Sequence, residues 1–119
     1  MTDDSDPTAD VAPESEGTDG VGSETEDDVL DALFTTIEAR KRDLPEGSYT
    51  ASLFTHEKGE NAVLEKLGEE TTEVILAAKD DDEEELLHES ADFVYHLLVL
   101  LAMKDLSVED LRDELEARF

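Results

Sequence analysis

The chain has no cysteine, and among its 119 residues it has only 9 basic ones against 35 acidic ones. Without cysteine neither a disulfide framework nor a thiolate metal site can form, which favours a reducing compartment. The sequence also lacks an uninterrupted apolar run of the roughly 20 residues that span a membrane. Its first residues lack the basic flank and the apolar segment of a signal peptide. We therefore expect a soluble, cytoplasmic protein.

The shortage of basic residues gives the chain a formal net charge of -26 at pH 7. A surface of this sign repels the phosphates of nucleic acids and the headgroups of anionic membranes, so we expect neither as a partner. The acidic balance resembles that of proteins from extreme halophiles, in which molar salt screens the self-repulsion over a few ångströms. On this interpretation the charge reflects the solvent more than the function.

The chain divides near residue 28 into two parts of different composition. Residues 1–28 contain eleven acidic residues, no Lys or Arg and no aromatic residue. Such a segment cannot offset the entropy lost on ordering, so we predict a disordered acidic tail that solvates the protein in preference to binding a partner. Residues 29–119 contain all six aromatic residues and form the single folded domain that we expect.

Apolar residues recur at helical spacing in three stretches of this domain. The first stretch covers residues 29–43, ends in a basic cluster that suits the helix dipole, and is followed by helix-breaking Pro45 and Gly47. The other two stretches cover about residues 61–79 and 83–104. No strand pattern of comparable strength appears, so we predict an all-α fold.

The connections between these stretches complete the expected architecture. The acidic run 80–85 is predicted to form a solvated turn and the start of the next helix, so the two long central helices should pack antiparallel in a helical bundle. Residues 48–61 are ambiguous between a turn of helix and a loop. Ser107 and Asp110 approximate a capping box for a final helix that ends near Phe119.

Acidic residues line one edge of the apolar face on each central helix. Because successive residues advance by about 100° around a helix, the acids of the earlier helix fall within about 100° of one another, and the polar residues of the later helix fall within about 60°. The earlier edge contains Lys66, Glu69, Glu70 and Glu73, and the later edge contains Glu89, Asp92 and His96. Packing the two apolar faces together would bring both edges to the same side.

This packing would create a cluster of four carboxylates, from Glu70, Glu73, Glu89 and Asp92. Four like charges at close range cannot all stay ionised unless something neutralises them. Oxygen ligands without cysteine, and without a clear histidine pair, indicate Mg²⁺ or Mn²⁺ in preference to zinc. Magnesium is often bound jointly by a few carboxylates and by substrate phosphates, which indicates a polyphosphate substrate. On geometry alone, salt-adapted surface acids at helical spacing would explain the pattern equally well.

Particular motifs favour the metal site. The stretches "EETTE" and "ESAD" resemble the EExxE…ExxD signature of the MazG-like all-α nucleoside polyphosphate pyrophosphohydrolases. More narrowly, "SYTASLF", "EKLGEETTEVILAAK" and "ELLHESADFVYHLLVLL" are similar in order and spacing to stretches of the phosphoribosyl-ATP pyrophosphohydrolases of histidine biosynthesis. The resemblance covers about residues 29–119 and leaves out the acidic tail.

The resemblance implies a concrete reaction and metal. Members of this family cleave phosphoribosyl-ATP between the α and β phosphates, which gives phosphoribosyl-AMP and pyrophosphate with Mg²⁺. This is the second step of histidine biosynthesis. By the same resemblance, Glu69 would orient or deprotonate the attacking water, or support the metal ligands through hydrogen bonds. Carried over residue by residue, the ligands are Glu70, Glu73, Glu89 and Asp92.

The resemblance also bears on assembly and domain content. Related proteins bury long helices against a second copy, so we expect a homodimer with sites near the interface. Family members are often fused to phosphoribosyl-AMP cyclohydrolase, the next enzyme of the pathway. Residues 29–119 are too few to supply that domain and contain no cysteine, so we expect the pyrophosphohydrolase step alone.

Substrate contacts are expected from four further residues. Lys66 lies one turn before Glu70, and we expect it to bind a phosphate in preference to forming a salt bridge with Glu70. Ser48, Tyr49 and Thr50 match the family's loop. Their hydroxyl groups would bind phosphate or ribose, although forming and capping a turn explains them equally well.

The remaining polar residues of the later central helix are expected to have structural roles. His96 lies on the metal-facing edge, but a lone helical histidine more often packs in the core or supports a neighbouring ligand. His88 and Tyr95 are predicted to face elsewhere and to be either structural or exposed. Two other functions stay open: a MazG-like hydrolase that removes ordinary or modified nucleotides would use the same carboxylates, and an acidic helical interaction module would need no catalysis.

Overall fold

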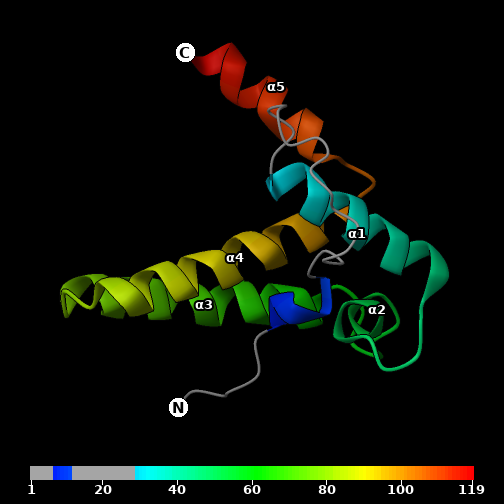
Figure 1. Ribbon diagram of the computed structural model, residues 1–119, viewed down its shortest axis with the longest axis horizontal. Coiled ribbons are helices and arrows are strands. Elements are labelled where there is room, and N and C mark those ends of the chain that lie inside the picture. Colours follow the sequence, from blue (N-terminus) through cyan, green and yellow to red (C-terminus); the bar gives the residue numbers. More distant parts are fainter. Residues whose placement is uncertain (1–6, 12–28) are drawn as a thin grey trace, which may run out of the picture.

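The computed structural model describes residues 7–11 and 29–119, and these residues form helices and no strand (Figure 1). The all-α prediction is therefore confirmed for the described part of the chain. The elements are the 3-10 helix η1 (Pro7–Val11) and the α-helices α1 (Val29–Asp43), α2 (Tyr49–Phe54), α3 (Asn61–Lys79), α4 (Glu83–Met103) and α5 (Val108–Arg118).

Helices α3 and α4 form a long antiparallel pair, which is the most extensive contact between elements (Figure 1). The turn between them contains only residues 80–82, because Asp81 adopts the left-handed conformation at φ 58°. Asp82 then caps α4, since its carboxylate accepts a hydrogen bond from the backbone N–H of Glu85 at 3.0 Å. A connection this short permits only an antiparallel arrangement, as predicted.

The hydrophobic core lies at the end of this pair that is remote from the turn. There α1 packs across α4 and against α2 (Figure 1). Side chains from these elements and from the start of α3 interlock in the core, and fully or almost fully buried examples are Ile37, Leu53, Val63, Tyr95, Leu98 and Val99. These residues fix the α2 segment against α4, and α2 carries the candidate loop residues.

Burial of the central helices is less complete than the apolar pattern predicts. On α3 the predicted apolar face is buried at Val63, but Ile75 is 53% exposed, and on α4 Leu87 is 73% exposed. A groove of about 350 Å³ lies between the two helices and is lined by Thr71, Val74, Ile75, Ser90, Phe93 and Val94. The prediction fails here because the helices that complete the core cover only one end of the pair.

Helix α4 is also long and apolar enough, by length and composition alone, to cross a membrane. It packs instead against α3 and α1, and it carries Asp92 and His96 in buried positions. Buried ionisable residues and helix contacts of this kind are those of a core helix in a soluble protein.

At the C-terminal end, α5 projects from α1 (Figure 1). Ser107 and Asp110 form the predicted capping box, with reciprocal hydrogen bonds of 3.1 and 2.9 Å. Arg112 attaches the helix to α1 through two hydrogen bonds to the Asp31 carboxylate, at 2.8 and 2.7 Å. This bidentate pair raises the pKa of Arg112 further above its ordinary value, chiefly through the hydrogen bonds to Asp31.

The segment 7–11 departs from the prediction of a disordered tail over residues 1–28. It forms η1, which packs against α1, α2 and α4, and Val11 is 3% exposed within the core. Specific donors hold Asp10 in place, and a segment's average composition cannot reveal such donors. The rest of the predicted tail, residues 1–6 and 12–28, lies outside the described residues.

Candidate active site

A buried chain of hydrogen bonds connects α3, α4 and α2. The His96 ring is completely buried; its Nδ1 lies 2.8 Å from Oε1 of Glu70, and its Nε2 lies 3.0 Å from the hydroxyl of Tyr49. Glu70 is also buried, at 6% exposed. The edge of α3 that carries Glu70 and the edge of α4 that carries His96 therefore meet on one side of the helix pair, as the helical angles predict.

The hydrogen-bond partners define which atoms carry protons in this chain. Burial, together with the charges of Glu70, Asp92 and Glu69, raises the pKa of Tyr49 to about 12. The Glu70 carboxylate accepts hydrogen bonds, so Nδ1–H of His96 donates to it, and Nε2 of the same ring can then accept from the Tyr49 hydroxyl.

A second acidic group lies on α4 itself. His88, Glu89 and Asp92 each offer a ligand atom, and these atoms lie within 4.8 Å of one another. Nε2 of His88 is 3.5 Å from Oδ2 of Asp92. The prediction that His88 faces elsewhere is therefore wrong. The two residues are four positions apart on one helix, and this spacing brings side chains together on the same face.

Glu89 has an environment that disfavours its charge. Burial raises its pKa to about 7, with further contributions from a hydrogen bond to Glu85 and from the charge of Asp92. Sequence reasoning missed Glu85 as a member of this group. The signal was present, because Glu85 precedes Glu89 by four residues and thus lies on the same edge of the helix.

The donor atoms of this group fit a small divalent cation. Mg²⁺ binds oxygen at about 2.0–2.1 Å, so two ligands on opposite sides of one ion lie about 4 Å apart, close to the spacing of the atoms on α4. Carboxylate oxygens suit Mg²⁺ and Mn²⁺, and the His88 imidazole is better suited to Mn²⁺ than to Mg²⁺. Of the predicted ligands, Glu89 and Asp92 thus lie together, and the charges of Glu70 and Asp92 both raise the pKa of the loop residue Tyr49.

The other acids of the α3 edge lie at the surface. Glu69 and Glu73 are exposed. Lys66 forms an ion pair with Glu69, with Nζ 3.5 Å from Oε1. The salt-bridge partner considered from the sequence was Glu70 instead. The Lys66 side chain is 42% exposed, so its ammonium group can reach an anion from solvent. The assignment of Glu73 as a metal ligand stays a prediction.

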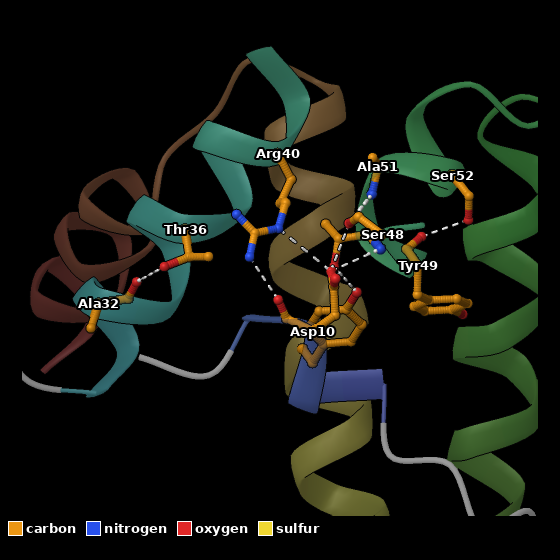
Figure 2. Close-up of polar contacts among 10 residues, drawn as sticks. Asp10, Ala32, Thr36, Arg40, Ser48, Tyr49, Ala51 and Ser52 are labelled. Atoms are coloured by element: carbon orange, nitrogen blue, oxygen red, sulfur yellow. Dashed lines mark hydrogen bonds and ion pairs between the residues drawn. The ribbon is translucent and has the colours of Figure 1, made fainter. Parts of the chain in front are cut away.

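The loop residues Ser48, Tyr49 and Thr50 have different environments. Ser48 caps α2, because its hydroxyl accepts a hydrogen bond from the backbone N–H of Ala51 at 3.0 Å, as the capping alternative predicts (Figure 2). The Thr50 hydroxyl is buried against the hydroxyl of Tyr95. Tyr95 therefore has the structural role that was expected. Of the three loop hydroxyls, that of Tyr49 is the one bonded to the metal-facing edge of α4.

Asp10 of η1 also binds this loop, through hydrogen bonds to Ser48 and Thr50. Its carboxylate accepts hydrogen bonds from the Ser48 hydroxyl at 2.8 Å and from the Thr50 backbone N–H at 3.1 Å (Figure 2). Arg40 donates to the Asp10 carbonyl at 2.8 Å. Burial raises the pKa of Asp10, but the hydrogen bonds from Thr50 and Ser48 and the charge of Arg40 outweigh it, so the pKa is lowered overall.

The region that carries these residues matches a known family. The model of the phosphoribosyl-ATP pyrophosphohydrolase family matches residues 30–119, which include every candidate residue except Asp10. The chain belongs to this family. The match confirms the resemblance inferred from the motifs "EETTE" and "ESAD".

Individual relatives support the assignment to the phosphoribosyl-ATP pyrophosphohydrolase family. A phosphoribosyl-ATP pyrophosphatase of Natronomonas pharaonis is 77% identical over 92 residues, which cover 77% of this chain and 91% of the relative. One of Haloarcula marismortui is 74% identical over 91 residues, covering 76% and 93%. One of Methanocella arvoryzae is 50% identical over 91 residues, covering 76% and 96%. Relatives from halophiles agree with the interpretation of the acidic composition.

Proposed function

We propose that this chain hydrolyses phosphoribosyl-ATP to phosphoribosyl-AMP and pyrophosphate, the second step of histidine biosynthesis. The observation that carries the proposal is the family match over residues 30–119, at up to 77% identity to a named phosphoribosyl-ATP pyrophosphatase. The buried acids Glu70 and Asp92 occupy the motif positions within that match. They supply the oxygen ligands that a metal-dependent reaction on a polyphosphate requires.

The acidic side chains would hold Mg²⁺, or Mn²⁺, between the protein and the substrate. The bound cation would polarise the phosphate oxygens and neutralise developing charge. The cation would be bound by Glu70, Glu89 and Asp92, with Glu73 as the fourth ligand and His88 as an adjacent donor. Without a cation the strongly acidic protein would repel the substrate, so these residues also make binding of a polyphosphate possible.

Residues at the rim of the cluster would handle water and phosphate. We assign to Glu69 the orientation of the attacking water and the acceptance of its proton, since Glu69 is exposed beside buried Glu70. Lys66 would exchange its ion pair with Glu69 for a substrate phosphate. Tyr49 would contact the substrate from α2. Ser48 and Thr50 would shape that loop, because their hydroxyls are already bonded inside the protein.

The assembly that we propose is a homodimer in the cytoplasm. Its support is the apolar surface on the outer part of α3 and α4, where Ile75 and Leu76 are 53% and 50% exposed beside the groove. A second copy that covers this surface would remove it from water, which is favourable at roughly 25 cal/mol per Å² of apolar area. Analytical ultracentrifugation in molar salt tests this directly, and a purely monomeric chain would contradict it.

One assay tests the proposed reaction. Pyrophosphate release from phosphoribosyl-ATP is measured with Mg²⁺ and with a chelator, across a salt series, beside a panel of ordinary nucleoside triphosphates. We expect Mg²⁺-dependent release from phosphoribosyl-ATP at far higher kcat/KM than from the panel. Equal or better turnover of the panel would instead identify a nucleotide-removing hydrolase. No release from any substrate at any salt concentration would leave an acidic interaction module.

A further inference from the structure

We infer that His96 is a positioning residue that couples the metal site to the substrate loop, by binding Glu70 through one ring nitrogen and Tyr49 through the other. The inference rests on the proposed function, because it assumes that Glu70 is a metal ligand and that the loop faces the substrate. No role in the reaction follows for His96 from the acidic motif, which ends at Asp92. The contacts of the ring carry the inference.

The His96 ring is held from several sides. Its Nδ1 is 2.8 Å from Oε1 of Glu70 and 3.2 Å from the backbone carbonyl oxygen of Asp92, one turn earlier in α4. The ring of Tyr95 lies edge-on at 4.8 Å between centroids, and that of Tyr49 at 6.0 Å. Rotation of a fully buried ring would leave both nitrogens without partners, which is costly.

The His96 ring orients the carboxylate of Glu70. Oε1 of Glu70 accepts the hydrogen bond from His96 at 2.8 Å, which orients the carboxylate that would hold the metal ion. Ligand carboxylates depend on such outer hydrogen bonds, and their loss commonly costs about 10–100-fold in metal affinity or activity. Glu70 comes from α3, whereas Glu89 and Asp92 come from α4. His96 therefore sets the relation between ligands on two different helices.

The other nitrogen of the His96 ring contacts the loop through Tyr49. The Tyr49 hydroxyl lies 3.0 Å from Nε2 of His96, and by donating to that nitrogen it would hold the ring hydrogen on Nδ1, where Glu70 accepts it. The loop itself is fixed at Ser48 and Thr50 by hydrogen bonds to Asp10. A substrate that shifts the Tyr49 hydroxyl must therefore also affect, through His96, the orientation of the Glu70 carboxylate. A metal ion that binds Glu70 must in turn affect the position of Tyr49. By linkage the two binding equilibria influence each other equally.

The inference is tested with two variants of the same residue that each keep one half of the contact. In His96→Asn the side-chain amide replaces Nδ1 and can still donate to Glu70, but it no longer reaches Tyr49. In His96→Gln the longer side chain replaces Nε2 and keeps the partner at Tyr49, but it loses the donor to Glu70. His56→Asn is the matched control, because His56 is exposed and lies outside the site.

Mn²⁺ affinity is measured by electron paramagnetic resonance and by calorimetry, without substrate, on each folded variant. We expect His96→Gln to weaken Mn²⁺ binding by about 10–100-fold, while His96→Asn and His56→Asn stay close to the unaltered chain. In the pyrophosphate assay we expect His96→Asn to raise KM more than it lowers kcat. Equal Mn²⁺ affinity in all variants, or equal loss in both His96 variants, would overturn the inference.

A third variant covers the case in which His96→Gln does not fold. Tyr49→Phe keeps the ring and removes one hydroxyl, so it should fold. Without that hydroxyl the imidazole of His96 is no longer held with its hydrogen on Nδ1, so Mn²⁺ binding should weaken several-fold although Tyr49 is no metal ligand. The amide of His96→Asn always carries its donor hydrogens and escapes this loss. Unchanged Mn²⁺ affinity in Tyr49→Phe would also overturn the inference. Because metal affinity is read without substrate, an inactive but metal-binding chain would reject the proposed reaction and leave the positioning role supported.

Discussion

The middle of the α3–α4 pair and its turn end are both rich in acid but differ in what surrounds each carboxylate. In the middle of the pair, Glu70 is 6% exposed and has the buried His96 as its partner. At the turn end, the acids of residues 80–84 are exposed. Molar salt screens exposed charges within about 3 Å, whereas a buried carboxylate must be satisfied by specific neighbours. The comparison shows that burial and partners, not the number of acids, mark the site.

The largest effect is expected when one charge is removed either in the middle of the helix pair or at its turn end. Glu70→Gln and Asp92→Asn should each lower Mg²⁺-dependent pyrophosphate release by about 10²–10³-fold, the cost of losing one group that stabilises transition-state charge. Glu84→Gln, an isosteric change among the exposed acids, should leave release unchanged. Circular dichroism checks that all three variants are folded. Full activity in both site variants would refute the ligand assignment.

The raised pKa of Glu89 should make metal binding depend on pH. Because Glu89 has a pKa of about 7, a cation must displace its proton in mildly acidic buffer. Mg²⁺ affinity should therefore fall by up to about tenfold per pH unit below 7 and level off above it. Glu89→Gln should bind more weakly and lose most of this dependence. Calorimetry in two buffers of different ionisation enthalpy measures the proton released.

The same pKa gives the sign of a stability effect in the metal-free chain. A carboxyl group whose pKa is higher in the folded state binds more protons than in the unfolded chain. Stability from Glu89 is therefore greatest below the unfolded value near 4.3 and is lost as pH rises towards 7. Thermal melting with a chelator should show a smaller loss over this range in Glu89→Gln than in the unaltered chain. An identical loss in both would contradict the raised pKa.

A smaller effect is expected where η1 joins the loop. Asp10→Asn replaces a charged acceptor of two hydrogen bonds, so it should destabilise the fold by about 1–2 kcal/mol. The lowered pKa of Asp10 means that this contribution is present above the unfolded value near 3.9 and is lost as pH falls through the folded value. Urea unfolding at neutral pH measures it, with the exposed Asp113→Asn as control. Equal stabilities would show that the contact contributes nothing.

The smallest effect belongs to the exposed end. Asp82→Ala removes the cap of α4 and should cost about 1 kcal/mol, whereas Asp82→Ser keeps a capping oxygen without the charge and should cost little. Thermal unfolding of both variants separates capping from charge. If the serine variant lost as much stability as the alanine variant, the carboxylate charge at the helix start would be the stabilising feature.

The sequence predicted the long helices well because their periodic signals are long. The bounds of α1 and α3 agree with the apolar spacing, and α4 ends one residue before the predicted position. The six-residue α2 was ambiguous, since it is too short for a period and depends on the Ser48 cap and on contacts with α1. Its conformation is set by tertiary structure, which no local pattern contains.

The candidate site was predictable to a similar degree. Glu70 and Asp92 follow from the motif and from helical angles, and their burial agrees with both. The contact of His88 with Asp92 was missed, although the spacing of four residues places both side chains on one face of the helix. The partners of His96 could not be predicted, because they lie 26 and 47 residues away in the chain. Such contacts depend on how three helices pack.

The three-residue turn after Lys79 also fixes the rotation of α4 relative to α3. Exposed turns generally accept insertions, and the acids here can be exchanged for other polar residues at little cost. Its length is another matter. One additional residue that joined α4 would rotate the helix by about 100° and shift it by about 1.5 Å, which would carry the imidazole away from the glutamate it serves. The length of this exposed turn thus determines whether the side chains of His96 and Glu70 lie opposite each other.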